Sequence, residues 1–326
     1  MTSKKIRDPR INGEIRLYAG SASPDLAGEI SDCLGVPLSG RDLVRFPNEN
    51  IFCRLHASAR GQDVYVIQST TSPVSDNLME LLIMLQTLRL DSVGRLTAVV
   101  PYLCYSRSDK KDQPRVSIAA RLVADMMEVA GADRYITLDL HAGQIQGFFS
   151  IPGDVLTAFH ILSDHFQQCH ERMHNPVVVT ADLGYAKKGR NFAAKLGLPI
   201  AFIEKRRQQN DARTEAVGVI GEVHDRDVII VDDEVDTAGS VTEAYHIVKE
   251  KGARDVYLSF VHAVLSDPAT ERLQRTDFKA IVTTNTVQIP AAKKLPNMTV
   301  LSIAPLLAEV ILRAHEGRSV GEMFNE

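Results

Sequence analysis

The stretch from Asp227 to Thr242, DVIIVDDEVDTAGSVT, constrains the fold of this chain more than any other. Its apolar, β-favouring residues Val228–Val231 are typical of a parallel strand that is buried on both faces. Two carboxylates, Asp232 and Asp233, follow at the expected end of that strand. A helical pattern over Val241–Lys251 comes after a loop of small and polar residues, which are Asp236, Thr237, Ala238, Gly239 and Ser240. The stretch predicts a strand–loop–helix unit of an α/β protein.

A loop of this kind can bind a phosphate group. In an open α/β sheet, ligands bind beyond the carboxyl ends of the strands, where loops meet the first turns of helices. Small residues let backbone N–H groups close around a phosphate, and the helix dipole adds to the attraction. Two carboxylates beside this cradle suit a sugar phosphate, with or without Mg²⁺. The alternative is an acidic turn with Ser or Thr as the helix N-cap, but the whole block D-D-x-x-D-T-A-G-S favours a ligand site.

Strand-like and helix-like segments alternate along most of the chain, which predicts an α/β fold of doubly wound parallel sheets. The expected strands are Ile15–Ala19, Val64–Gln68, Leu96–Pro101, Tyr135–Leu138, Val177–Thr180, Ile200–Glu204, Val228–Asp232, Val256–Val261 and Ala280–Thr283. The expected helices are Asp25–Leu34, Asp76–Leu90, Ile118–Ala130, Tyr185–Leu196, Val241–Lys251 and Pro305–His315.

The two halves of the chain are similar to each other, which indicates an internal duplication. Each half has a helix, a Gly-X-Pro-X motif (Gly35–Leu38 and Gly197–Ile200), a pair of short strands and a strand–loop–helix unit. The first half has Gln68 and Ser69 where the second has its two carboxylates, so only the second keeps the sugar-phosphate site. We expect an N-terminal domain over residues 1–154, a C-terminal domain over residues 155–304, and a helix and tail over residues 305–326.

The composition excludes several classes of protein. The chain has a net charge of −4, and no block of Lys and Arg alternates with aromatic residues, which argues against nucleic-acid binding. Its longest wholly apolar run, Leu81–Leu85, is too short to cross a bilayer, and its polar start lacks the apolar core of a signal peptide. Four cysteines at unrelated spacings suit reduced thiols in the cytoplasm better than a disulfide framework.

Further polar residues lie at other expected strand ends. Asp139 and His141 are two residues apart after a strand, so on an extended chain they share a side and could face one cation. Asp182 follows another strand. The alternative to a metal site is a polar strand end for Asp139 and His141, and a helix N-cap for Asp182. Lys205 and Arg207 open a basic loop that suits charge neutralisation during phosphoryl transfer, unless this loop is only a solvated turn.

Taken together, these segments resemble the ribose-phosphate diphosphokinases. The loop Asp232–Ser240 is similar to the phosphoribosyl-diphosphate loop that this family shares with type I phosphoribosyltransferases. The resemblance runs from about Ile15 to the C-terminus and includes QSTTSPVSDNLMELLIML, DLHAGQIQGFF and SIAPLLAEVI. It implies two domains of phosphoribosyltransferase type. It also implies transfer of the diphosphoryl group of MgATP to the 1-hydroxyl of ribose 5-phosphate, giving 5-phosphoribosyl 1-diphosphate and AMP.

The resemblance implies roles for the residues of the second half. Asp232 and Asp233 would hold the ribose hydroxyls, and the loop Asp236–Ser240 would hold the 5-phosphate. Lys205 and Arg207 would stabilise charge on the transferring group and on the departing AMP.

The resemblance also implies a metal site and a nucleotide site. Mg²⁺, the expected cofactor, would bind His141 and Asp182, with Asp139 as a further candidate. ATP would bind two loops of the first half, one of them contributed by a neighbouring subunit; the candidate residues are Phe46, Asn48, Glu49, Asn50, Arg107, Ser108 and Asp109. The implied assembly is a homo-hexamer built from dimers, with phosphate as activator and ADP as inhibitor.

The sequence departs from the family pattern at several positions, which include Asn50, Ser108, Ser150 and Lys188. These departures concern nucleotide affinity, metal affinity and regulation more than the reaction itself. Two alternatives follow: a catalytically silent regulatory homologue, and a phosphoribosyltransferase that consumes the diphosphate together with a nucleobase. Intact Lys205 and His141 count against the first, and the duplicated first half with Arg107 counts against the second.

Overall fold

The computed structural model describes residues 13–182, 184–207 and 214–323, and for residues 205–207, 214–217 and 322 it describes the backbone alone. Contacts divide the chain into two compact units. The first unit holds the described residues up to Thr137, together with Ala142–Val155 and residues 304–323. The second holds Leu138–His141 and Leu156–Ile303, so Asp139 and His141 belong to the same unit as the acidic loop. The linear domain boundaries given above stay a prediction.

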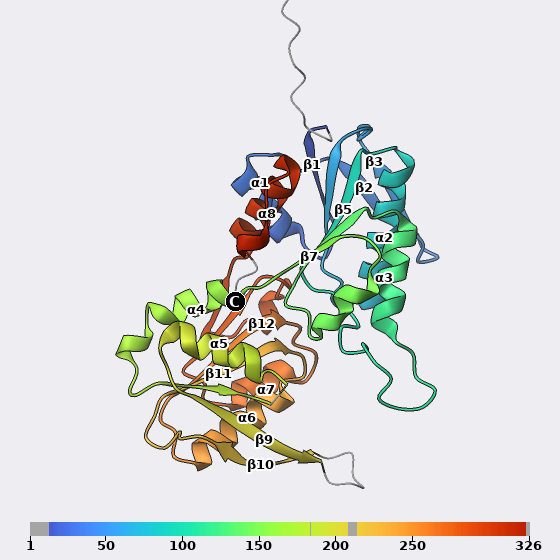
Figure 1. The fold of residues 1–326 in the computed structure, drawn as a ribbon. Coiled ribbons are helices and arrows are strands. Elements are labelled where there is room, and N and C mark those ends of the chain that lie inside the picture. The colour runs from blue at the N-terminus through green and yellow to red at the C-terminus, as the bar shows by residue number, and fades with distance from the viewer. Residues whose placement is uncertain (1–12, 183, 208–213, 324–326) are drawn as a thin grey trace, which may run out of the picture. The chain divides into compact units, whose positions relative to one another are not determined.

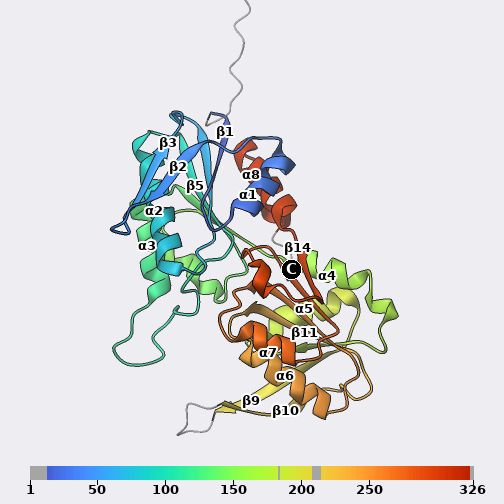
Figure 2. The same ribbon diagram turned by 180° about the vertical axis from the view of Figure 1, so that it is seen from behind.

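A five-stranded sheet forms the centre of the first unit, in the order β1-β4-β5-β6-β7 (Figure 1). Strands β1, β4, β5 and β6 pair in parallel. Helices α1 and α8 cover one face of this sheet, and α2 and α3 cover the other (Figures 1 and 2). Because both faces are covered, all residues of β4 are buried. A separate antiparallel hairpin, β2–β3, follows α1. The bounds are β1 Ile15–Ala19, α1 Pro24–Leu34, β2 Arg41–Arg45, β3 Ile51–Leu55, β4 Asp63–Ile67, α2 Val74–Leu90, β5 Arg95–Val100, α3 Ala119–Ala130, β6 Arg134–Leu138, β7 Gly153–Leu156 and α8 Ala304–Glu316.

A seven-stranded sheet forms the centre of the second unit, in the order β10-β9-β8-β11-β12-β13-β14. All neighbours in it pair in parallel except β9 and β10, which are antiparallel. Helices α4 and α5 pack together on one face, and α6 and α7 pack together on the other (Figure 1). The bounds are α4 Phe159–Gln167, β8 Val177–Thr180, α5 Ala186–Leu196, β9 Ile200–Arg207, β10 Thr214–Ile220, β11 Val228–Val235, α6 Gly239–Glu250, β12 Val256–Ala263, α7 Ala269–Arg275, β13 Ala280–Thr284 and β14 Met298–Leu301.

The two sheets repeat one topology. The order β1-β4-β5-β6-β7 in the first unit corresponds to β8-β11-β12-β13-β14 in the second, and each first strand is followed by a helix and an antiparallel strand pair. Both of these helices end at a glycine in the left-handed region, Gly35 at φ 64° and Gly197 at φ 67°, which is the usual helix C-terminal geometry. The predicted fold class, two doubly wound parallel sheets related by duplication, is confirmed.

Two predicted strands extend further than expected. Strand β11 continues to Val235, because its pairing with β12 continues past the apolar residues. Asp233 therefore lies within the strand rather than after it, and Asp232 is not the last residue of the strand. Strand β9 continues to Arg207 because it pairs with β10, so the backbone of Lys205 and Arg207 is extended and not in a loop. Cross-strand pairing of this kind leaves no signal in the local sequence pattern.

A buried charged cluster fixes α8 to the first sheet. Asp63, which is fully buried, accepts hydrogen bonds from the Nε and Nη2 atoms of Arg95 at 2.7 and 2.6 Å. Tyr65 Oη and His315 Nδ1 contact the same carboxylate at 3.0 and 2.8 Å. Arg95 Nη2 also donates to the carbonyl oxygen of Ala314 at 3.0 Å. The C-terminal helix is thus held by both charge and hydrogen bonds.

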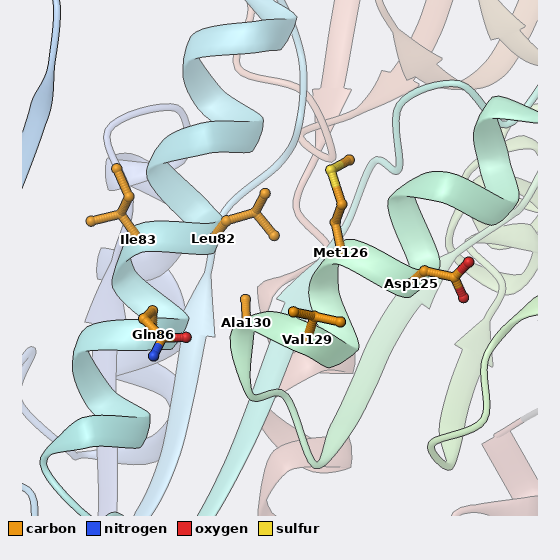
Figure 3. A pocket seen from close by; sticks show the side chains of 7 residues that line it. All are labelled: Leu82, Ile83, Gln86, Asp125, Met126, Val129 and Ala130. Atoms are coloured by element: carbon orange, nitrogen blue, oxygen red, sulfur yellow. The ribbon is translucent and has the colours of Figure 1, made fainter.

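An apolar groove lies between α2 and α3 on the outer surface of the first unit (Figure 3). It has a volume of about 390 Å³ and is lined mainly by aliphatic side chains, with Val129 84% exposed at its edge. In the part of the chain that the structure describes, no helix is long and apolar enough to span a membrane.

Candidate active site

Two strand ends of the second unit meet at His141. Its Nδ1 atom lies 2.7 Å from Oδ2 of Asp233, which sits in the buried strand β11. A carboxylate oxygen accepts hydrogen bonds, so Nδ1 carries the proton and Nε2 carries the lone pair of the neutral ring. A carboxylate that holds a histidine in this way fixes the ring and leaves Nε2 as its ligand atom, a common arrangement at metal sites.

The two neighbouring carboxylates of β11 differ in their electrostatics. Burial works against the charged form of Asp233, yet its hydrogen bond with His141 lowers the pKa of this carboxyl to about 2. Burial, followed by the charge on Asp233, raises the pKa of the Asp232 carboxyl well above its ordinary value. Asp232 Oδ1 accepts the backbone N–H of Asp233 at 2.9 Å. The pair therefore favours ligands that supply hydroxyl donors or positive charge.

The acidic strand leads into a turn at the start of α6. Ala238 immediately precedes α6 and adopts the left-handed region at φ 60°, and no described side chain caps the first turn of that helix. Consecutive backbone N–H groups in such a turn form a concave site for anions, which the helix dipole strengthens. Arg272 of α7 donates from Nη1 to the carbonyl oxygen of Thr237 at 2.9 Å. Its guanidinium thus places a positive charge beside the predicted phosphate loop.

Asp139 is positioned differently from the other acidic residues. Its side chain is only 2% exposed and accepts three hydrogen bonds from within the protein. Its backbone takes the left-handed region at φ 38°, which is strained for a residue with a side chain. Two residues later the chain reaches His141, so the turn at Asp139 sets where the imidazole lies.

Asp182 and the two predicted catalytic residues lie on neighbouring strands. Asp182 is exposed just after β8, and its Oδ1 accepts the backbone N–H of Tyr185 at 3.0 Å. Strand β9, which carries Lys205 and Arg207, pairs with β8. The side chains of Lys205 and Arg207 lie outside what the structure describes, so their roles stay predictions.

The first predicted ATP loop is the tip of the β2–β3 hairpin in the first unit. Phe46 is 46% exposed, and its ring centroid lies 6.0 Å from that of Phe52, which is also exposed. Backbone hydrogen bonds join Phe46 to Asn50 and to Glu49, which adopts φ 68°, and Asn48 Oδ1 accepts the N–H of Asn50. An exposed aromatic pair on a rigid turn suits stacking against a flat ring.

The second predicted ATP loop follows β5. Arg107 is exposed and Ser108 is partly buried, with its N–H bonded to the carbonyl oxygen of Tyr105. Asp109 is buried and accepts a hydrogen bond from Gln144. Of this group, Arg107 is the side chain most accessible to a nucleotide, while Asp109 holds the loop in place.

The chemistry of the donors suits Mg²⁺. Among the residues that the structure describes, no group of three or more His, Cys, Asp or Glu side chains could hold a metal by itself. Mg²⁺ does not need such a cage, because it keeps several waters and is commonly bound by one or two protein ligands together with substrate phosphates. The exposed carboxylate of Asp182 is an oxygen ligand of this kind, and Nε2 of His141 could bind a nucleotide-bound metal beside phosphate oxygens.

Comparisons with known proteins identify the family. Residues 15–131 match the N-terminal domain of ribose phosphate pyrophosphokinase, and residues 207–325 match the phosphoribosyl synthetase-associated domain. The ribose-phosphate pyrophosphokinase of Clostridium tetani is 43% identical over 312 residues, covering 95% of this chain and 97% of that protein. This chain belongs to the ribose-phosphate pyrophosphokinase family. The family protein from Campylobacter jejuni is 43% identical over 309 residues, with 95% and 98% covered.

A solved structure agrees with this assignment. The phosphoribosylpyrophosphate synthetase from Mycobacterium smegmatis is 40% identical, covers 93% of this chain and 99% of its own, and has a TM-score of 0.88. The resemblance predicted from sequence motifs is therefore confirmed at the level of the family.

Several residues of the site were not recognised from the sequence. Lys188 was noted only as a departure from the pattern of the ribose-phosphate pyrophosphokinase family, and Thr157, His262 and Arg272 were not singled out. One signal was present: His262 lies near the end of an apolar run, where a buried polar residue needs partners. The others act through contacts between segments that are distant in sequence.

Proposed function

We propose that this chain transfers the diphosphoryl group of MgATP to the 1-hydroxyl of ribose 5-phosphate, forming 5-phosphoribosyl 1-diphosphate and AMP. The observation that carries the proposal is the match to ribose-phosphate pyrophosphokinases over 95% of the chain. Nothing in the comparisons favours a regulatory homologue or a phosphoribosyltransferase.

The sugar would bind at the end of β11. We propose that Asp232 and Asp233 accept hydrogen bonds from the ribose hydroxyls, and that the N–H groups of Asp236–Ser240 hold the 5-phosphate. The left-handed turn at Ala238 supports this, as does the first turn of α6, which no described side chain caps, because backbone N–H groups at a helix start attract anions. Hydroxyls also suit Asp232, whose desolvated carboxylate gains from new hydrogen-bond donors.

We propose that Nε2 of His141 and the carboxylate of Asp182 hold the cofactor Mg²⁺. When bound there, Mg²⁺ would supply positive charge that offsets the negative charge developing during transfer. Asp233 then has two tasks, since it faces the ribose and keeps the His141 ring in one tautomer and orientation. This shared carboxylate links the sugar site to the metal site.

The remaining roles concern the nucleotide. We propose that Lys205 and Arg207 stabilise negative charge on the transferring group, which is the main task of the protein in phosphoryl transfer. The exposed ring of Phe46, with Asn48, Glu49 and Asn50 beside it, would support the adenine. Arg107, Ser108 and Asp109 would form the second wall of the nucleotide site.

The test is product formation by the purified protein. With ribose 5-phosphate, ATP and Mg²⁺, the wild type is expected to release AMP and 5-phosphoribosyl 1-diphosphate in equal amounts. Lys205→Ala should lower kcat by at least 100-fold, in the range found when one preorganised charge or donor is removed. Lys195→Ala, which removes a lysine paired with Asp164 on the surface, is the matched control and should retain the wild-type rate.

Assembly, effectors and location are further parts of the proposal. We propose a homo-hexamer built from dimers, with phosphate and ADP as effectors. The apolar groove between α2 and α3 supports self-association, because exposed apolar surface gains free energy when a partner covers it (Figure 3). Light scattering at increasing protein concentration tests the assembly. Four unpaired cysteines support a cytoplasmic location.

A further inference from the structure

The carboxylate of Asp139 is fully engaged inside the protein. Oδ1 accepts hydrogen bonds from the Thr157 hydroxyl at 3.0 Å and the Lys188 ammonium at 3.2 Å. Oδ2 accepts the backbone N–H of Ala158 at 2.7 Å. A metal ion at this carboxylate would have to displace Lys188, since two cations sharing one oxygen repel each other strongly in a buried site. These contacts favour a role for Asp139 other than metal binding.

The backbone of Asp139 is held as firmly as its side chain. Its N–H donates to the carbonyl oxygen of Leu156 at 2.9 Å, and its own carbonyl oxygen lies 3.3 Å from Nε2 of His262. Since a carbonyl only accepts, Nε2 of His262 is the donor, and its Nδ1 faces the Thr286 hydroxyl at 3.0 Å. Strained backbone of this kind persists only where surrounding contacts enforce it, and such positions cluster at functional sites.

Lys188 connects this strained turn to the second metal residue. It lies in the first turn of α5, six positions after Asp182, and its ammonium is 5.7 Å from the centroid of the Tyr185 ring. The N–H of Tyr185 donates to Asp182, so Tyr185 contacts both residues. A single ammonium thus ties the segment that carries Asp182 to the segment that carries His141. The Lys188–Asp139 pair is mostly buried, with side chains 28% and 2% exposed.

We propose that Asp139 and Lys188 are positioning residues, which set the placement of the metal ligands His141 and Asp182 without binding the metal themselves. This inference rests on the proposed function of the same site. Partners that orient metal ligands typically contribute about 10- to 100-fold to metal affinity. The buried carboxylate of Asp139 requires a positive charge with hydrogen-bond donors at position 188, because an unpaired buried charge is strongly destabilising.

The experiment measures metal binding directly. Mn²⁺ replaces Mg²⁺, and its free concentration is followed by electron paramagnetic resonance in the presence of ribose 5-phosphate and α,β-methylene-ATP, which cannot undergo diphosphoryl transfer. Lys188→Met is expected to weaken Mn²⁺ binding about 10- to 100-fold, while Lys188→Arg keeps the positive charge and should lose less affinity than Lys188→Met. Lys195→Met on the same helix is the matched control and should leave Mn²⁺ binding unchanged.

A second variant separates positioning from loss of charge or of folding. Thr157→Val removes one hydrogen bond to Asp139 and no charge, and it should weaken Mn²⁺ binding in the same direction with unchanged circular dichroism. The inference is overturned if folded Lys188→Met binds Mn²⁺ like wild type. It is also overturned if Lys188→Met binds Mn²⁺ more tightly while Asp139→Asn abolishes binding, because Asp139 would then be a ligand.

These outcomes are distinct from failure of the proposed function. If wild type binds Mn²⁺ but forms no AMP from ATP and ribose 5-phosphate, the proposed reaction is wrong. The positioning role is then still tested by comparing the Mn²⁺ affinity of Lys188→Met with that of wild type. If wild type forms AMP and folded Lys188→Met keeps wild-type Mn²⁺ affinity, the reaction stands and the positioning role is wrong.

Discussion

The buried cluster around Asp63 gives the sharpest prediction about stability. Arg95→Met keeps most of the side-chain volume but removes the guanidinium that neutralises a fully buried carboxylate. Two charge-assisted hydrogen bonds are lost, at about 1.5–3 kcal/mol each, which gives about 3–6 kcal/mol. Breaking a buried ion pair by removing one partner typically costs about 3–5 kcal/mol, so the two routes agree. The carbonyl oxygen of Ala314 in α8 also loses its donor.

The assay is urea denaturation of Arg95→Met, with hydrogen exchange to locate the effect in β4 and α8. The free energy of unfolding of the first unit should fall by about 3–5 kcal/mol, which corresponds to roughly 6–20 °C in Tm for a unit of this size. Arg121→Met is the control, because it breaks an exposed i,i+4 pair with Asp125 and should cost less than about 1 kcal/mol. A loss below 1 kcal/mol in Arg95→Met would refute the argument that Asp63 depends on this charge.

Three further predictions concern the active site. Asp232→Asn should raise the free energy of unfolding by about 0.5–2 kcal/mol at pH 7 while abolishing protection by ribose 5-phosphate in thermal melts. The pKa of the Asp232 carboxyl is raised in the folded state, so at a pH above the unfolded-state pKa of about 3.9 this carboxyl destabilises the fold. The gain in the free energy of unfolding from Asp232→Asn should therefore vanish below about pH 3.9. Arg272→Met should raise KM for ribose 5-phosphate about 5- to 30-fold with little change in kcat, because it removes a positive charge and a hydrogen bond to the loop that together contribute about 1–2 kcal/mol to binding. Initial rates measure both constants, and a fall in kcat as large as the rise in KM would contradict this prediction. Phe46→Ala should raise KM for ATP by about 5- to 150-fold, as expected for about 1–3 kcal/mol of base stacking, and unchanged ATP saturation would count against the adenine platform.

The regular elements were largely predictable from the sequence, because helical and strand periodicity is a local property. Strands β1 and β8 have the predicted bounds, and the predicted helices agree to within two residues at each end. Helices α4 and α7 were not predicted, and neither were the edge strands β7 and β14. These elements are short, and they are stabilised by packing against a sheet rather than by their own pattern.

The site was predictable to the extent that its residues follow one another in the chain. The block from Asp232 to Ser240 is contiguous and forms one strand–loop–helix unit, so its pattern is visible in the sequence. The contact between His141 and Asp233 joins residues 92 positions apart, and the contact between Asp139 and Lys188 joins residues 49 apart. Such pairs depend on tertiary structure, so the sequence pattern could not indicate the partners of His141 and Asp139.

In the proposed reaction, the diphosphoryl group moves as one unit from ATP to ribose 5-phosphate. Phosphorus NMR of a reaction with wild-type protein, Mg²⁺, ATP and ribose 5-phosphate tests it most directly. AMP should appear together with a diphosphate whose inner phosphorus is bonded through oxygen to carbon 1 of the sugar. Appearance of ADP with a sugar bisphosphate would show transfer of a single phosphoryl group and would contradict the account, as would the absence of any new phosphorus signal.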